Sequence, residues 1–336
     1  MSASRRRILT QAGAFLAAQA VTPVGVAAPA ATLLVATPAT HDPGPGQPDA
    51  PSRLAAIYAR LSDAPFASLR RVEAVAASRD DILAVHAPAL IERLERAAPG
   101  EGYAPLSPDL VMSSGTLAAA FRGAGGAIGA VDAVMRGEAR NAFVATRPPG
   151  HHATQAESMG FCFFNNAAIA ARHAMRAHGA ERVAIFDFDA HHGNGVQEIF
   201  WREPHVLYCS THQMPLYPGT GAASETGEQG NIVNAPLHRG DDGAAFRAAL
   251  KDRILPRLDA FAPDLILICA GFDAHIHDPL AQLRFIEDDF RDATLRALEI
   301  AARRCKGRIV SLLEGGYRGD DLAASVAAHI GALMEA

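Results

Sequence analysis

Acidic and histidine side chains are crowded into Asp187–Gly195, directly after a short apolar run. The run, Val183–Phe186, is β-branched and aromatic, which predicts a buried strand. Alternate side chains of an extended backbone share one face, so Asp189 and His191 can point at one spot. A carboxylate and an imidazole are two of the three protein ligands that an open zinc site needs. A bound cation would also offset the cost of burying these charges.

A candidate third ligand follows a second apolar run, Leu265–Cys269. Asp273 comes after Gly271 and is the one acidic residue among apolar neighbours there. A lone aspartate in such a place is more often the N-cap of a helix. Because this strand is expected to end beside Asp189, ligation is the preferred interpretation.

An open zinc ion can activate water and polarise a carbonyl group, as the hydrolysis of an amide requires. That reaction also needs a base for the attacking water and an acid for the leaving amine. The pair His151 and His152 could serve, since Pro148–Gly150 makes the preceding loop tight, although two adjacent histidines are more often surface residues. Asp187 and Asn194 are candidates to orient the two imidazoles through their second ring nitrogens. Tyr317, after two glycines, could donate a hydrogen bond to the developing oxyanion.

These residues follow apolar runs that alternate with helical patterns. The runs are Ala142–Thr146, Val183–Phe186, His205–Cys209, Leu265–Cys269 and Arg308–Leu313. Helical patterns cover 52–61, 87–97, 115–136, 165–178, 242–261, 287–304 and 320–334. Such alternation predicts an α/β fold with an open, mostly parallel sheet and helices on both faces. Ligands bind at the carboxyl edge of such sheets, where the polar clusters fall.

Length and composition limit the remaining possibilities. The chain has 336 residues, 49% of them hydrophobic, and residues 32–336 are interpreted as a single catalytic domain. A net charge of -5 and 6% aromatic residues argue against nucleic acid as a partner. The scattered cysteines fit buried apolar positions better than a disulfide framework. Asp109, Glu157 and Glu225 are interpreted as solvated surface charges.

The first 31 residues differ from the rest. Arg5–Arg7 precede an alanine-rich apolar stretch, and Ala28–Ala30 form a small-residue cleavage pattern. This arrangement is typical of a secretory signal of the twin-arginine type, which predicts export to the periplasm. The alternative is a cytoplasmic enzyme with an N-terminal extension. Pro23 and Gly25 make the stretch a poor membrane span, so no stable span is expected.

Four motifs together resemble the histone deacetylase superfamily, and the resemblance runs from about Thr32 to the C-terminus. The motifs are Arg147–Ala153, Asp187–Gly195, Ala270–His275 with Asp278–Leu280, and Glu314–Tyr317. The class II-type branch, with bacterial deacetylase-like amidohydrolases and acetylpolyamine amidohydrolases, is the most similar. The resemblance implies an arginase-like α/β fold and the zinc-dependent removal of an acetyl group from an acetylated amine, either a small molecule or a peptide.

Residue by residue, the resemblance implies a complete site. The zinc ligands would be Asp189, His191 and Asp273. The catalytic residues would be His151, His152 and Tyr317, with Asp187 and Asn194 beside the histidines. The substrate channel would be formed by Gly160, Phe161 and Tyr217. A monovalent cation, K⁺, would be held by Asp187, Asp189, His191, Ser210 and Thr211.

The sequence departs from the superfamily pattern in two places. Asn194 stands where class I members have a second aspartate, as in class II-type members, which leaves the division of labour between the histidines open; His152 is the preferred main base. Gln47–Arg53 differs from the usual His-Pro-Glu-Arg-Pro segment, so no contact is carried over there. Two other functions stay open: a non-catalytic protein that binds acylated or cationic ligands, and a ureohydrolase. The latter would need a binuclear ligand set that the motifs lack.

Overall fold

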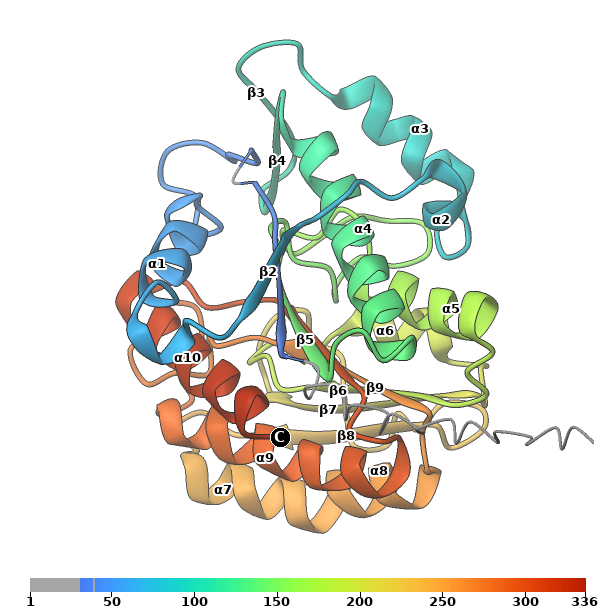
Figure 1. Cartoon of the computed structure of the whole chain (residues 1–336). Helices are drawn as coiled ribbons and strands as arrows, with labels where there is room; N and C mark the ends of the chain where they lie inside the picture. The colour runs from blue at the N-terminus through green and yellow to red at the C-terminus, as the bar shows by residue number, and fades with distance from the viewer. Residues whose placement is uncertain (1–30, 39) are drawn as a thin grey trace, which may run out of the picture.

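An eight-stranded sheet forms the centre of the computed structural model, which describes residues 31–38 and 40–336 (Figure 1). All of its neighbouring strands are parallel, in the order β2-β1-β5-β10-β9-β6-β7-β8. Its strands are β1 (Leu33–Ala36), β2 (Arg70–Glu73), β5 (Asn141–Ala145), β6 (Val183–Asp187), β7 (Val206–Gln213), β8 (Ile232–Leu237), β9 (Leu265–Ala270) and β10 (Ile309–Leu313). The predicted signal-like segment, except for residue 31, lies outside the described residues.

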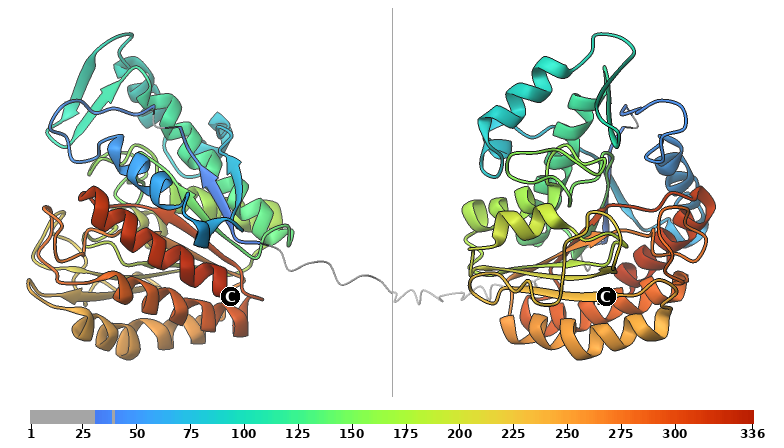
Figure 2. Two further views of the ribbon diagram at one scale, coloured as in Figure 1. Left: turned by 60° about the vertical axis from the view of Figure 1, so that its left-hand side comes forward. Right: turned by 180° about the vertical axis from the view of Figure 1, so that it is seen from behind.

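Helices cover both faces of the sheet, as Figures 1 and 2 show. On one face lie α1 (Ser52–Arg60), α7 (Gly243–Ala249), α8 (Leu255–Phe261), α9 (Glu287–Arg304) and α10 (Gly319–Glu335). On the other lie α2 (Arg79–Leu83), α3 (Pro88–Ala97), α4 (Thr116–Met135), α5 (Asn166–His178) and α6 (Asn194–Phe200). Each layer has its own apolar core against the sheet. The predicted α/β architecture is confirmed.

The five predicted central strands are present, but β7 is longer than its apolar run. Ser210 and Thr211 were predicted to follow this strand, and they lie inside it. The reason is a neighbouring strand, β8, which the sequence did not predict and which pairs with Tyr208–Gln213. Asn234 and Pro236 interrupt the apolar pattern of β8. Pairing across the sheet therefore extends β7 beyond the point where its own sequence turns polar.

Three other departures concern elements outside the central strands. The edge strand β2 was not predicted from the sequence. It is exposed along its whole length, and charged side chains are usual on such an edge. A separate antiparallel hairpin, β3 (Tyr103–Ser107) and β4 (Leu110–Ser113), precedes α4. The single helix predicted over 242–261 is divided by a π-helical segment, Leu250–Ile254, between α7 and α8.

The helix α4 is long and apolar enough to cross a membrane by length and composition, and it is the one such helix among the described residues. It packs between β5 and α5 in this structure, and 56% of its apolar window is buried there. Burial against the sheet accounts for the apolar composition of α4. All four cysteines are buried and free, as predicted for small apolar side chains.

Candidate active site

The three predicted metal ligands meet at the carboxyl edge of the sheet. Asp189 and His191 lie in the loop after β6, and Asp273 lies in the loop after the neighbouring strand β9. A potential ligand atom of each residue lies within 4.8 Å of the other two. His191 Nδ1 is 2.8 Å from Asp273 Oδ2 and 3.2 Å from Asp189 Oδ1. The donor set is therefore two carboxylates and one imidazole.

This donor set fits a zinc ion. Asp189 and Asp273 are 1% and 0% exposed, so their charges need compensation. Two glycines leave room for them: a Cβ on Gly271 would overlap Asp189 Oδ2, and one on Gly315 would overlap Asp273 Oδ2. Carboxylate oxygen and imidazole nitrogen are ordinary zinc ligands, and three protein ligands leave a position open for water or substrate.

The adjacent histidines have different partners. His151 Nδ1 lies 3.0 Å from Asp187 Oδ2, whereas His152 Nδ1 lies 2.8 Å from Asn194 Oδ1. Burial lowers the pKa of His151, but the charges of Asp187 and Asp189 outweigh burial and raise it to about 10. Burial and the neighbouring charge of His151 hold the pKa of His152 well below its usual value. His152 is thus the histidine that stays neutral and able to accept a proton.

Tyr317 is positioned by contacts on both sides of its loop after β10. Its backbone N–H donates to Asp278 Oδ2 at 2.8 Å. Arg53 lies over its ring at 4.9 Å from the centroid and donates from Nε to the carbonyl oxygen of Gly316 at 2.5 Å. Burial raises the pKa of Tyr317 well above its usual value. The hydroxyl therefore remains protonated and can donate.

A pocket of about 240 Å³ joins these groups to the surface. It is lined by His152, His191, Tyr317, Gly160, Phe161, Tyr217, Leu216, Leu280 and Asp109. Gly160 and Phe161 have positive φ angles of 56° and 65°, and a Cβ on Gly160 would overlap the ring of His152. This tight turn places the Phe161 ring 5.8 Å from that of Tyr317. All three predicted channel residues line the pocket.

Of the five residues predicted to hold K⁺, Asp187 and Ser210 already use side-chain oxygen atoms in hydrogen bonds within the protein. Asp187 Oδ1 accepts from the backbone N–H of Asp189 at 3.1 Å. Ser210 pairs with Asp187 in the register of β6 and β7, and its hydroxyl bonds to His212 Nδ1 at 2.9 Å. Thr211 Oγ1 is buried with no hydrogen-bond partner. The potassium site stays a prediction.

Sequence reasoning missed a buried ionic network at Asp49, in the segment that departs from the family pattern. Its Oδ1 accepts from Arg53 Nη1 at 2.7 Å and from Arg147 Nε at 2.6 Å. Burial raises the pKa of Asp49, but the charge of Arg147, a hydrogen bond from His41 and the charge of Arg53 hold it well below its usual range. Arg53 Nη2 also donates to the carbonyl oxygen of Glu314 at 2.6 Å. This network joins the N-terminal segment to the loop that carries the tyrosine.

Glu314 is a second residue whose role sequence reasoning missed. Its Oε2 accepts from the backbone N–H groups of Gly150 and His151 at 2.7 and 3.2 Å. Burial raises the pKa of Glu314 to about 7. The carboxyl group therefore fixes the backbone of the histidine loop from the neighbouring strand end. The sequence feature that could have identified Glu314 is its position in the motif Glu314–Tyr317, directly before two glycines.

Two more positions differ from expectation or gain a role. Asp109 was expected to be a solvated charge, but its Oδ2 accepts from Gly160 N–H at 2.8 Å and from the Tyr217 hydroxyl at 3.1 Å. Because the hairpin β3–β4 was not predicted, neither was the approach of Asp109 to the pocket.

His192 had no predicted role, and its ring bonds to Thr220 Oγ1 at 2.8 Å and Gln197 Oε1 at 3.1 Å.

Known proteins resemble this chain over most of its length. The family model of the histone deacetylase domain matches residues 47–333. The uncharacterized protein slr0245 of Synechocystis is 39% identical over 290 residues, which are 85% of this chain and 93% of that protein. The histone deacetylase-like amidohydrolase of Pseudomonas aeruginosa is 42% identical over 255 residues, 75% of this chain and 67% of its own.

Structural similarity agrees with these matches. The crystal structure of the HDA15 HD domain superposes with a TM-score of 0.85 at 33% identity, covering 91% of this chain and 88% of that one. A probable deacetylase of Archaeoglobus fulgidus is 38% identical over 283 residues, 82% of this chain and 78% of its own. The chain belongs to the histone deacetylase family, in a group that includes bacterial deacetylase-like hydrolases.

Proposed function

We propose that this protein is a zinc-dependent deacetylase that hydrolyses the amide bond of an N-acetylated amine. The observation that carries the proposal is the convergence of three metal-ligand residues, two histidines with different partners and one tyrosine around one pocket. The zinc ligands would be Asp189, His191 and Asp273. When bound there, zinc would activate a water molecule and polarise the acetyl carbonyl group.

The protein's own side chains would move the protons and bind the developing charge. His152, neutral beside Asn194, would accept the proton of the attacking water and pass it to the leaving amine. His151, charged beside Asp187, would stabilise negative charge next to it. The Tyr317 hydroxyl would donate to the oxyanion, an interaction needed mainly in the transition state.

The pocket supports a substrate with a slender apolar chain next to the acetyl group. Phe161, Tyr217, Leu216 and Leu280 supply apolar walls around a space of about 240 Å³. Acetyl-lysine in a peptide, an acetylpolyamine or another small acetylated amine has such a chain. Of these classes, the predicted export favours a small molecule or a cell-envelope amide over a histone.

Activity on a fluorogenic acetyl-lysine amide and on N-acetylputrescine tests the function. A chelator should abolish hydrolysis, and added Zn²⁺ should restore it. Zinc-replete protein that hydrolyses none of a range of acyl amides would contradict the proposal, and ligand binding without turnover would favour the non-catalytic alternative.

Tyr317→Phe tests the oxyanion donor. We expect kcat to fall about 100- to 1,000-fold with a much smaller change in KM, because the lost bond acts in the transition state. Tyr103→Phe, at an exposed tyrosine outside the pocket lining, is the matched control. Equal losses in kcat and in substrate affinity would count against this role.

We also infer that the protein is exported through the twin-arginine route. The inference rests on Arg5–Arg7 and the apolar stretch that follows. Cell fractionation of the full chain and of an Arg5→Lys, Arg6→Lys variant tests it. Wild-type protein in the periplasm and the variant in the cytoplasm are the expected results, whereas cytoplasmic wild-type protein would refute the inference.

A further inference from the structure

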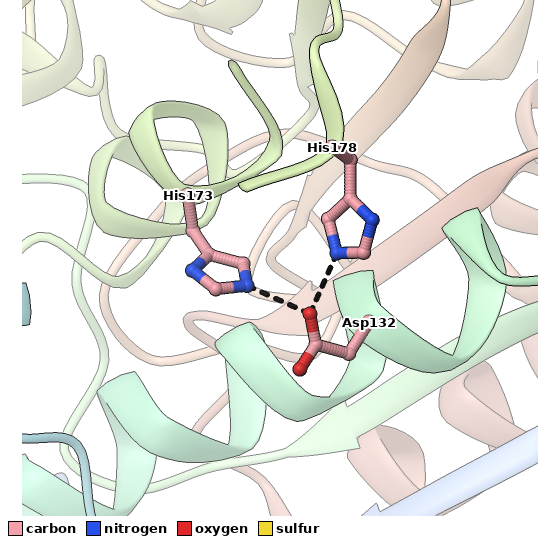
Figure 3. Close-up of side chains that lie close together, drawn as sticks. All are labelled: Asp132, His173 and His178. Atoms are coloured by element: carbon pink, nitrogen blue, oxygen red, sulfur yellow. Dashed lines mark hydrogen bonds and ion pairs between the residues drawn. The ribbon is translucent and has the colours of Figure 1, made fainter. Parts of the chain in front are cut away.

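A second group of possible metal ligands lies between α4 and α5. Asp132 belongs to α4, and His173 and His178 belong to α5 (Figure 3). Both imidazoles point at the same carboxylate oxygen: Nε2 of His173 is 2.8 Å from Asp132 Oδ1, and Nε2 of His178 is 2.6 Å from it. The three ligand atoms lie within 4.8 Å of one another.

This group is separate from the catalytic pocket. The helix α4 ends at Met135, shortly before β5 begins, and α5 ends at His178, shortly before β6 begins. Both helix ends therefore lie at the amino edge of the parallel sheet, whereas the active site lies at the carboxyl edge. A ligand bound between these helix ends would not contact the catalytic residues.

We propose that Asp132, His173 and His178 bind one divalent transition-metal ion, with Zn²⁺ as the reference ion. Two imidazoles and one carboxylate form a common zinc donor set, and imidazole also suits Cu, Fe and Ni. Tetrahedral zinc at ordinary bond lengths places its ligand atoms about 3.4 Å apart. The Nε2 to Oδ1 distances of 2.8 and 2.6 Å thus need to lengthen by less than about 1 Å.

The surroundings leave the three side chains partly exposed. The side chains of Asp132, His173 and His178 are 26%, 19% and 12% exposed, so small rotations are possible. Arg136 pairs with the other oxygen, Asp132 Oδ2, at 3.3 Å, which leaves Oδ1 to the histidines. A pocket of about 300 Å³ reaches this group at His173, one of its lining residues.

The bound ion would fasten the end of α5 to α4. Gly179, with a φ of 65°, ends α5 directly after His178, so the second histidine sits on the last helical turn. The alternative is a hydrogen-bonded cluster in which both imidazoles carry a proton on Nε2 and share one acceptor. The two arrangements differ in metal content and in the response of thermal stability to added metal.

A third group, His275, His277 and Asp321, supplies the matched control. His277 is 56% exposed, and Asp321 is already paired with Arg318 at 3.0 Å. A His277→Gln variant removes one imidazole of this group and leaves the α4–α5 group intact.

The experiment uses the full chain and counts bound Zn²⁺ by mass spectrometry and calorimetry. We expect an Asp189→Asn, Asp273→Asn variant, disabled at the catalytic site, to bind one equivalent and to show a higher Tm with Zn²⁺. Adding His173→Gln or Asp132→Asn should abolish that equivalent and the Tm shift, whereas adding His277→Gln should not.

Wild-type protein provides a second measurement if the disabled variant does not fold. It should hold two equivalents, and the His173→Gln variant should hold one while keeping full deacetylase activity. Equal metal content in wild type and His173→Gln, or loss of the equivalent only in His277→Gln, would overturn the proposal. The decisive outcome is the loss of one equivalent from wild type to His173→Gln, and this difference does not depend on the proposed catalytic function.

Discussion

The neighbouring histidines of the active site differ chiefly in the charge of the group that each one faces. His151 faces the carboxylate of Asp187, and His152 faces the neutral amide of Asn194. A full charge stabilises an imidazolium ion far more than an amide oxygen does. Burial and the charge of His151 lower the pKa of His152, while Asp187 and Asp189 raise that of His151. Such separated pKa values are a common way to divide acid and base roles.

Asn194→Asp tests this division at the level of one residue. The added charge should raise the pKa of His152 by about 1 unit or more, so that His152 is protonated at higher pH. A base must be neutral, and the acid limb of the kcat/KM profile should therefore move to higher pH by the same amount. An acid limb that stays in place in a folded, metal-loaded variant would contradict His152 as the base.

At this scale the sequence predicts the residues of local motifs and misses those whose partners are remote. Asp189, His191 and Asp273 could be predicted because each follows an apolar run that marks a strand end. Asp49 lies in a segment rich in proline and glycine, and its partner Arg147 is 98 positions away. No local pattern distinguishes a buried aspartate from an exposed one when the compensating charge comes from elsewhere in the chain.

At the level of elements, strands that are buried on both faces have continuous apolar sequences, and these sequences made the central strands predictable. The edge strands β2 and β8 have no such continuous apolar sequence. The edge strand β2 is exposed throughout, and β8 carries Asn234 and Pro236. Their pairing depends on neighbours that only the assembled sheet supplies, so the order and full width of the sheet could not be read from the sequence.

Two glycines one turn apart on α4 provide a test at this level. A Cβ on Gly125 would overlap the carbonyl oxygen of Val75, whereas one on Gly129 would meet nothing within 4 Å. Gly129→Ala should raise the free energy of unfolding by about 0.5–1 kcal/mol, since alanine favours a helix over glycine. Gly125→Ala should lower it by about 1–3 kcal/mol through overpacking.

Urea denaturation of both variants measures these changes, and each variant is the control for the other. Equal effects of the two substitutions would show that the close approach of α4 to the segment after β2 does not limit the side chain at position 125.

For the molecule as a whole, several histidines are buried in neutral form outside the active site. Burial lowers the pKa of His86 to about 4, of His212 to about 4 and of His329 to about 3. His329 bonds to Thr294 Oγ1 at 2.6 Å and Ser311 Oγ at 2.8 Å within the core. These side chains take up a proton when the chain unfolds in mild acid, but not while it is folded.

The stability that these histidines contribute in their neutral form should therefore be lost as the pH falls below about 6.5, the ordinary pKa of histidine. The unfolded chain binds the extra protons there, and each such histidine lowers the free energy of unfolding by about 1.4 kcal/mol per pH unit until its folded pKa is reached. Above about pH 6.5 this contribution is fully present and constant.

Replacing His329 by glutamine isolates one of these contributions. The slope of the unfolding free energy against pH, measured with urea between pH 6 and 5, should be smaller in His329→Gln by about 1.4 kcal/mol per unit. His238→Gln, at a side chain that is 86% exposed, is the control. A His329→Gln slope equal to that of the wild type would contradict the neutral buried state.

The Arg53 contacts have a consequence for the synthesis of the protein. Its guanidinium group, near the start of the folded chain, holds the carbonyl oxygens of Glu314 and Gly316, which the ribosome adds near the end. The strand that leads to these residues, β10, is itself central in the sheet, between β5 and β9. A growing chain thus contains the histidine pair and the proposed metal ligands before the loop of Tyr317 can bind Arg53. The pocket can therefore be completed only once the chain is nearly finished, so the proposed hydrolysis would begin after translation.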